Sequence, residues 1–351
     1  MNFPQKKSKK KPIIPLVIIG ILALIIASAN IWYFTNISGS TYPGEPRVLI
    51  IQPNDSVETI ANQLEEQGII KSALAFKIFL KLNDKAASIK SGEYRDLAQG
   101  FYPASEIAEI LTRGASKQTF RITIYPGDSL YKIKQRLISA GFTATAVDEA
   151  LNKDYDLEIL KIKPAEASLE GFLFGETYEF YSDASAEDVV KRAIEEFGKV
   201  AKAKNLAEAY QKHNLTLYEG LILASIIEKE SYKPDMAQVS QVFQLRLKKG
   251  IPLGSDATIA YAADLLNPNR DKTDMSILSI DSPFNTRKHV GLVPTPIASP
   301  GIEALMSVAN PAPGDYLFFL TGDSGMMYYA HTDSEHNRNI QLYCKERCKL
   351  I

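Results

Sequence analysis

The stretch Leu223–Ser231, LASIIEKES, closes a long apolar run and places two glutamates two residues apart at its end. The range Leu221–Ile227 contains no charged residue, so the pattern predicts a helix that is buried on all sides rather than an amphipathic surface helix. An ionised carboxylate in such a place is costly unless it is paired, reaches the edge of the core or keeps a proton. Glu228 and Glu230 are therefore candidates for a functional site.

The helix around these glutamates has recognisable limits. The range Thr216–Glu219 has the capping-box pattern, so we expect the helix to begin there and to stop before Pro234. Two residues apart on a helix means about 200° of rotation, so the two carboxylates cannot both face one site. Glu228 lies beside small side chains that leave room for a ligand, although an ion pair with a basic neighbour is the structural alternative. Glu230 lies beside bulky side chains, where we expect a Lys or Arg partner.

Length and charge narrow the class of protein. The 351 residues are 45% hydrophobic and 23% charged, which is enough for two or three globular units with real cores. The first 11 residues hold five lysines, so the remainder carries 35 basic and 41 acidic residues, a net charge of -6. This balance argues against a nucleic-acid partner.

An apolar segment near the N-terminus predicts a membrane anchor. Ile13–Phe34 has 22 residues without a charge, and at about 1.5 Å per residue it spans a bilayer core of about 30 Å. The lysines of residues 1–12 predict a cytoplasmic tail, and Trp32–Phe34 resembles an interfacial aromatic belt. We expect a single-pass helix over residues 13–35 in the inner (plasma) membrane, with the rest extracytoplasmic. Cleavage of a signal peptide after Ala27–Ala29 is the alternative, but the apolar run continues past that site.

A duplicated segment follows a Gly-, Ser- and Pro-rich linker at residues 36–46. Residues 48–70 recur as residues 122–142 at an offset of 73, and each copy reads as a strand, a turn and a helix that ends at glycine. The matching pairs are Pro53/Pro126, Asp55/Asp128, Ser56/Ser129, Ile60/Ile133, Leu64/Leu137 and Gly68/Gly141. This strand-turn-helix resembles LysM-like units, so we assign residues 47–165 to a LysM-like α+β region; a purely structural repeat is the alternative.

The remaining chain predicts an α+β catalytic domain over residues 166–342 and a tail over residues 343–351. Its loops are dense in Ser, Thr, Asn and Pro, and such loops on a substantial core commonly carry a site. Cys344 and Cys348 are the only cysteines, and a local disulfide between them is left open. Their spacing, without a second cysteine pair or suitable histidines, gives no reason to expect a metal site.

Four motifs in this order resemble one family. The segments LASIIEKES, LGSDATIAY, FNTRKHVGLVPTPIASPG and EHN follow an N-terminal anchor and a LysM-like region, and they resemble the YceG-like endolytic murein transglycosylases, the MltG family. The resemblance covers roughly residues 45 to 342. It implies that Glu228, the first glutamate of the EKE motif, is the catalytic acid/base and that no cofactor is needed. It also implies a glycan cleft lined by Ser255, Asp256, Thr258, Tyr261, Asn285, Thr286, His336 and Asn337.

The chemistry of this family explains why one carboxyl is enough. A glycoside hydrolase needs two carboxylates at the scissile bond. A lytic transglycosylase instead uses the C6 hydroxyl of the sugar as nucleophile and closes a 1,6-anhydro ring on N-acetylmuramic acid, so one glutamate can give and take the proton. An apolar helix end favours a partly protonated glutamate of this kind.

The sequence therefore predicts a membrane-anchored enzyme that cuts nascent peptidoglycan strands internally, near the membrane and between N-acetylmuramic acid and N-acetylglucosamine. Its expected partners are peptidoglycan strands, the membrane and peptidoglycan synthases. Two alternatives stay open. One is a non-catalytic peptidoglycan-binding scaffold, and the other is a muramidase-type hydrolase with Asp256 as second carboxylate.

Overall fold

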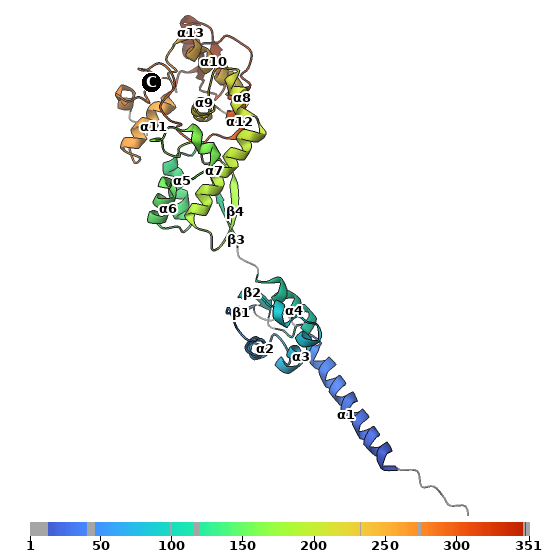
Figure 1. Cartoon of the computed structure of the whole chain (residues 1–351). Helices are drawn as coiled ribbons and strands as arrows, with labels where there is room; N and C mark the ends of the chain where they lie inside the picture. Colours follow the sequence, from blue (N-terminus) through green and yellow to red (C-terminus); the bar gives the residue numbers. More distant parts are fainter. Residues whose placement is uncertain are drawn as a thin grey trace, which may run out of the picture. The chain divides into compact units, whose positions relative to one another are not determined.

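The computed structural model describes residues 13–40, 46–98, 100–115, 119–231, 233–271, 275–346 and 348. The basic tail predicted at residues 1–12 and part of the expected linker lie outside the described residues. The chain forms two compact units, Met1–Gln118 and Thr119–Ile351 (Figure 1). Both units combine helices with antiparallel strands, which confirms the α+β class.

The N-terminal helix α1 spans Ile13–Ile37. Its part from Val17 to Ile37 is long and apolar enough to cross a membrane. The helix runs past the expected start of the linker, and Ile37 packs against the core of the first unit. Ser40 then forms a bridge with Phe101. A Cβ added to Gly39 would lie 2.5 Å from Cδ of Pro103, so only glycine allows this approach. The end of α1 is thus joined closely to the first unit.

The first unit packs three helices on a two-stranded sheet. Strand β1 (Pro46–Ile51) pairs antiparallel with β2 (Gly92–Ala98). Leu49 and Ile51 point into the core while Val48 and Ile50 are exposed, which is the alternation of a sheet with one covered face. The helical elements are α2 (Val57–Glu66), α3 (Ala73–Leu82), the short 3₁₀ helix η1 (Ala86–Ser88) and α4 (Ala104–Arg113).

The second unit has a larger, mostly helical core and two further strand pairs. Strand β3 (Thr119–Thr123) pairs with β4 (Thr177–Tyr181), and β5 (Phe318–Thr321) pairs with β6 (Met327–Ala330), both antiparallel. The helical elements in chain order are α5 (Leu130–Ser139), α6 (Ala144–Asn152), η2 (Glu158–Ile162), α7 (Ala186–Ala203), α8 (Leu206–Gln211), α9 (Leu217–Glu230), η3 (Lys233–Asp235), α10 (Met236–Lys249), α11 (Asp256–Leu266), η4 (Met275–Ser279), α12 (Ile302–Ala309) and α13 (Asp333–Tyr343).

Helix α9 is the buried helix that the sequence predicts. Thr216 and Glu219 form the capping box, and the side chains from Leu221 to Ile227 are all buried. Helices α8, α10, α11 and α12 surround it. A Cβ added to Gly220 would lie 2.0 Å from Cδ2 of Tyr210, so the backbone of α9 packs directly against the Tyr210 ring of α8 at this point. The two glutamates therefore sit at the end of a helix whose position the core fixes.

The two copies of the repeat have the same local structure. Copy one runs β1, turn and α2; copy two runs β3, turn and α5. Asn54 and Gly127 occupy the same turn position, with φ of 76° and 82°. The carboxylate of each matching aspartate accepts a backbone N–H three residues earlier. The copies nevertheless belong to different compact units, which divide after Gln118.

A disulfide and a backbone hydrogen bond hold the segment that follows α13. Cys344 and Cys348 form a disulfide, which answers the question left open by the sequence. The Cys344 side chain is buried, and the backbone N–H of Asp323 donates to the carbonyl of Tyr343. The segment after α13 is therefore fastened to the turn between β5 and β6.

Candidate active site

Glu228 lies where three segments meet at the end of α9. Its Oε2 accepts a hydrogen bond of 2.9 Å from the backbone N–H of Gly301, the N-cap of α12. A Cβ added to Gly301 would lie 3.3 Å from that oxygen, and one added to Gly127 would lie 3.8 Å from Cγ of Glu228. Gly301 thus lets the main chain approach the carboxyl group closely, and the main chain of Gly127 lies beside the Glu228 side chain. An amide at a helix N-terminus is a favourable donor to a carboxylate, so this contact fixes the position of one oxygen.

The turn of the second copy is tied to the same place. Nζ of Lys229 donates to the carbonyl of Gly127 at 3.1 Å. Gly127 N–H donates to the Ser299 carbonyl, and Ser299 N–H donates to the Asp128 carbonyl, each at 2.8 Å. Segments about 70 and 100 residues from Glu228 are therefore joined to each other by backbone hydrogen bonds, and the side chains of Lys229 and Glu228 hold them to the end of α9.

A cavity of about 660 Å³ adjoins this junction. Gly127 and Lys229 line it on the side of Glu228, and α5, α11 and the segment around Glu170 supply other walls. Its further lining residues are Ser129, Leu130, Tyr131, Lys132, Ser168, Ala257, Ala260, Tyr261, Asp264, Leu265, Pro268, Arg270 and Ile297. The cavity is large enough for a sugar ring or a short peptide.

Glu170 is a carboxyl group in this cavity that the sequence reasoning did not single out. It is 3% exposed, and both of its oxygens accept the Leu130 N–H at 3.1 Å. The hydroxyl of Tyr261 donates to Oε2 at 3.1 Å. Burial outweighs these donors and raises the pKa of Glu170 to about 7. Its only sequence signal is an acidic residue between the apolar Leu169 and Phe172, both of which are buried.

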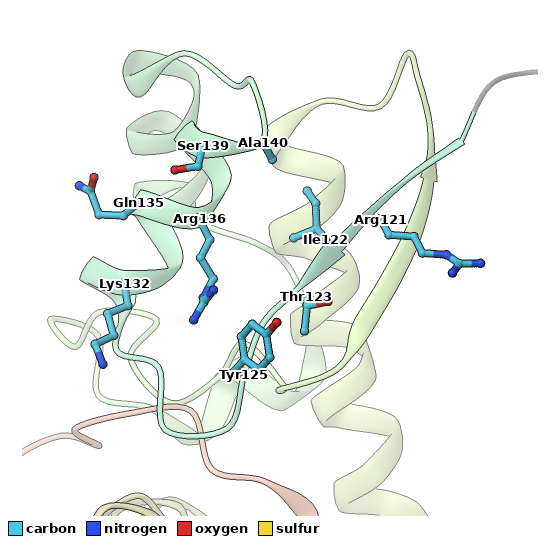
Figure 2. A pocket seen from close by; sticks show the side chains of 9 residues that line it. All are labelled: Arg121, Ile122, Thr123, Tyr125, Lys132, Gln135, Arg136, Ser139 and Ala140. Atoms are coloured by element: carbon cyan, nitrogen blue, oxygen red, sulfur yellow. The ribbon is translucent and has the colours of Figure 1, made fainter.

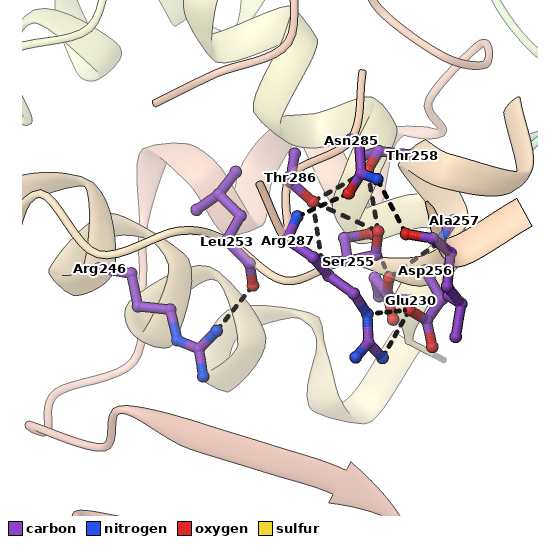
Figure 3. Close-up of polar contacts among 11 residues, drawn as sticks. Glu230, Arg246, Leu253, Ser255, Asp256, Ala257, Thr258, Asn285, Thr286 and Arg287 are labelled. Carbon is purple, nitrogen blue, oxygen red and sulfur yellow. Dashed lines mark hydrogen bonds and ion pairs between the residues drawn. The ribbon is translucent and has the colours of Figure 1, made fainter. Parts of the chain in front are cut away.

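Glu230 faces a different neighbourhood from Glu228, as the helix geometry requires. Its Oε1 accepts from the Ser255 hydroxyl and, at 3.4 Å, from the Ala257 N–H at the start of α11 (Figure 3). Desolvation raises the pKa of Glu230. The prediction that a Lys or Arg binds Glu230 is wrong. Arg287 instead forms an ion pair with Asp256 at 2.8 Å. The donors at Ser255 and Ala257 make a cationic partner unnecessary.

Three of the predicted cleft residues, Ser255, Thr258 and Thr286, form one buried network beside Glu230 (Figure 3). Asn285 is buried next to Thr286 and has hydrogen bonds of its own. Thr286 Oγ1 accepts the Ser255 N–H at 2.9 Å and lies 2.9 Å from Oγ1 of Thr258. Asn285 donates to the carbonyls of Leu278 and Ile280 at 3.1 and 2.8 Å. These polar groups join the segment before α11 to the segment after η4. Direct contact of the four residues with a glycan stays a prediction.

Tyr261, His336 and Asn337 have separate surroundings. Tyr261 lies in the cavity with Glu170, while the other two belong to α13. The His336 ring stacks on Phe318 with centroids 5.2 Å apart, and Asn337 donates to the Asp333 carboxylate at 2.8 Å. Burial, followed by the charge of Arg246, lowers the pKa of His336. The structure thus spreads the predicted cleft residues over three places.

The donor set of the site contains carboxylates, hydroxyls, amides and lysines. Within the described ranges, no group of three or more His, Cys, Asp or Glu side chains is placed to hold a metal ion. A carboxyl group fixed as Glu228 is fixed can transfer protons.

Comparison with known proteins agrees with the motif resemblance. The YceG-like family matches this chain over residues 49–342. The chain is 32% identical over 313 residues to the endolytic murein transglycosylase of Bacillus subtilis (strain 168), and the match covers 85% of this chain and 84% of that protein. It is 30% identical over 327 residues to the endolytic murein transglycosylase of Streptococcus pneumoniae serotype 2 (strain D39 / NCTC 7466), covering 83% of this chain and 57% of that protein.

A solved structure extends this likeness to three dimensions. The 2.6 Å crystal structure of a yceG-like protein from Listeria monocytogenes aligns with a TM-score of 0.54 at 27% identity, covering 84% of this chain and 99% of that chain. The chain therefore belongs to the YceG-like family.

Proposed function

We propose that this chain is a lytic transglycosylase that cuts peptidoglycan strands internally, between N-acetylmuramic acid and N-acetylglucosamine, and leaves 1,6-anhydro-N-acetylmuramic acid ends. The observation that carries the proposal is the position of Glu228, a carboxyl group at the end of a buried helix, held by the Gly301 N–H and approached by the main chain of Gly127. The names of the relatives from B. subtilis and S. pneumoniae support the same substrate and reaction.

In this mechanism Glu228 transfers protons and forms no covalent bond to the sugar. It protonates the glycosidic oxygen, so the bond from that oxygen to C1 of the muramic acid breaks. The C6 hydroxyl of the same sugar attacks C1 and returns its proton to the carboxylate. One C–O bond breaks and one forms, no water is consumed, and Glu228 ends protonated as it began. The amide of Gly301 would hold the carboxyl group in place through both transfers.

A muramidase-type hydrolase is the alternative function, and the observation that favours it is a second acidic side chain near Glu228. Asp256, the second carboxylate expected in that case, is bound by Arg287 at 2.8 Å. Glu170 is a further acid, buried in the adjoining cavity, and its raised pKa of about 7 suits an acid or base near neutrality. Hydrolysis would leave reducing ends instead of anhydro ends. A non-catalytic scaffold would leave the glycan uncut.

We also propose that the enzyme works close to the membrane surface. The apolar part of α1, Val17–Ile37, supports a single-pass anchor. The Ser40–Phe101 bridge and the packing of Ile37 join that helix directly to the first unit. Such an arrangement would hold the first unit near the place where new glycan strands leave the membrane, and peptidoglycan synthases would be natural neighbours.

The test is Glu228→Gln in the full chain, assayed on isolated peptidoglycan with identification of the product ends. The amide keeps the size of the side chain and an acceptor for the Gly301 N–H but cannot deliver a proton, so we expect kcat to fall about 10²–10⁴-fold with little change in stability. The control is Glu208→Gln, which neutralises an exposed carboxyl group on α8 and should keep normal turnover. A folded Glu228→Gln protein with near-normal turnover would refute the role of Glu228.

A further inference from the structure

Two hollows lined by basic side chains meet at Lys132 on α5. The first is the cavity beside Glu228, with a volume of about 660 Å³. The second is an open hollow of about 620 Å³ on the surface of the second repeat copy, and no acidic residue lines it. Lys132 lines both. In Figure 2, Lys132, Gln135 and Arg136 project from α5, and the Arg136 side chain points toward Tyr125, which follows β3. Lys132 is thus a wall common to both hollows, and we refer to the two hollows together as the path.

The cations along this path are not all neutralised by the protein. Arg136 binds Asp128 at 2.6 Å, and Arg270 binds Asp264 at 2.8 Å. Within the described part of the chain, in contrast, neither Lys132 nor Lys229 has a carboxylate within ion-pair distance. Desolvation and then the positive charge of Lys132 lower the pKa of Lys229, and the carboxylates of Asp128, Glu228 and Asp264 offset this only in part. Two lysines that repel each other at the mouth of a cavity are suited to receive an anion.

The peptidoglycan substrate carries anionic groups close to the bond that is cut. The scissile bond starts at C1 of the muramic acid, and the same sugar carries the stem peptide on its lactyl ether. An enzyme that cuts in the interior of a strand must therefore accommodate a stem peptide beside its catalytic carboxyl group at every cut. Stem peptides bear free carboxylates, whereas the glycan backbone itself is neutral.

We propose that the path from the cavity to the surface hollow is a subsite for the carboxylate-bearing stem peptide, with Lys132 as the contact shared by both parts. The inference rests on the proposed function, because it takes the glycan as the substrate. Lys229, which is anchored on Gly127 beside Glu228, lies nearest to the catalytic carboxyl group. Lys132 lies further out, where a peptide leaving the sugar would pass. The subsite would make the enzyme prefer glycan that still carries its stems.

The experiment measures binding, so that it does not depend on cleavage. The full chain in detergent, with Glu228→Gln to prevent turnover, is titrated with two preparations of purified glycan strands. One carries its stems; in the other an amidase has removed the stems and the lactyl carboxylates that it exposes have been converted to amides, so that these strands are neutral. The ratio of the two Kd values is the stem preference. We expect Lys132→Gln to reduce this preference about threefold and Lys132→Glu about tenfold, as for partly exposed ion pairs and a reversed charge.

Lys134→Gln is the matched control. Lys134 is on the same helix, and its ammonium binds Asp148 at 2.6 Å, so its loss should leave the stem preference unchanged. An unchanged preference in Lys132→Glu, or equal binding of both strands by the parent protein, would overturn the subsite. Failure of the proposed function has a different signature: the unmodified chain would cut neither strand, while a stem preference that depends on Lys132 would persist.

Discussion

Replacement of Glu170 by glutamine should change how stability depends on pH. Burial raises the pKa of this carboxyl group from 4.5 to about 7 in the folded protein. The folded state therefore binds more protons than the unfolded state between about pH 4.5 and 7, and the free energy of unfolding falls as the pH rises through this window. The rise of the pKa from 4.5 to about 7, at about 1.36 kcal/mol per pH unit, corresponds to about 3 kcal/mol in total.

The assay is urea denaturation of the full chain in detergent, followed by circular dichroism at pH 5 and pH 8. We expect the wild type to lose about 2–3 kcal/mol more stability between these pH values than Glu170→Gln does. The amide can still accept the Leu130 N–H and the Tyr261 hydroxyl. Because only the change with pH is compared, any constant cost of burying the amide cancels.

Glu166→Gln provides the control, since it removes an exposed carboxyl group from the same segment. It should leave the wild-type pH dependence in place. If Glu170→Gln and the wild type lose the same stability between pH 5 and pH 8, the carboxyl group of Glu170 does not take up a proton in this window, and the reasoning from burial is refuted.

Three further outcomes are expected. Gly220→Ala should lower the stability by about 3 kcal/mol in thermal unfolding, because the new Cβ would lie 2.0 Å from the buried ring of Tyr210; an unchanged melting temperature would contradict that contact. Glu230→Ala should cost about 1–3 kcal/mol, since it leaves the Ser255 hydroxyl and the Ala257 N–H without their acceptor, and a neutral effect in denaturation would show that the network can rearrange. A reporter that is active only outside the cytoplasm, fused to the C-terminus, should be active, and recovery of a chain cleaved after Ala29 would favour a signal peptide.

The sequence predicted most of what depends on local patterns. The capping box at Thr216, the apolar run of α9 and the opposed faces of Glu228 and Glu230 are all present in the structure. The strand-turn-helix of each repeat copy followed from Pro, Asp, Ser and Gly at fixed spacing. These features are decided by residues that are neighbours along the chain.

The rest depends on contacts between distant segments. Glu170 escaped notice because its partners, Leu130 and Tyr261, are 40 and 91 residues away in the sequence. The partner of Glu230 was mispredicted because a buried carboxylate needs donors but not a cation, and the N-terminus of α11 supplies them. Periodicity can say that a side chain is buried, but it cannot say which donors the fold brings to it.

The repeat shows how one local structure can serve two purposes. In the first copy, Ser56 caps its own helix by accepting the Thr59 N–H. In the second copy Ser129 makes no such bond, and the first helical N–H, that of Leu130, goes to Glu170 instead. The helix α5 is thereby capped from across the cavity, and this couples its position to the walls of the candidate site. Asn54 of the first copy corresponds to Gly127 of the second, and both have positive φ. The second copy, which has neither a side-chain cap of its own nor a side chain at this turn position, forms a wall of the site, whereas the first copy has both and lies in the unit that contains the apolar helix α1.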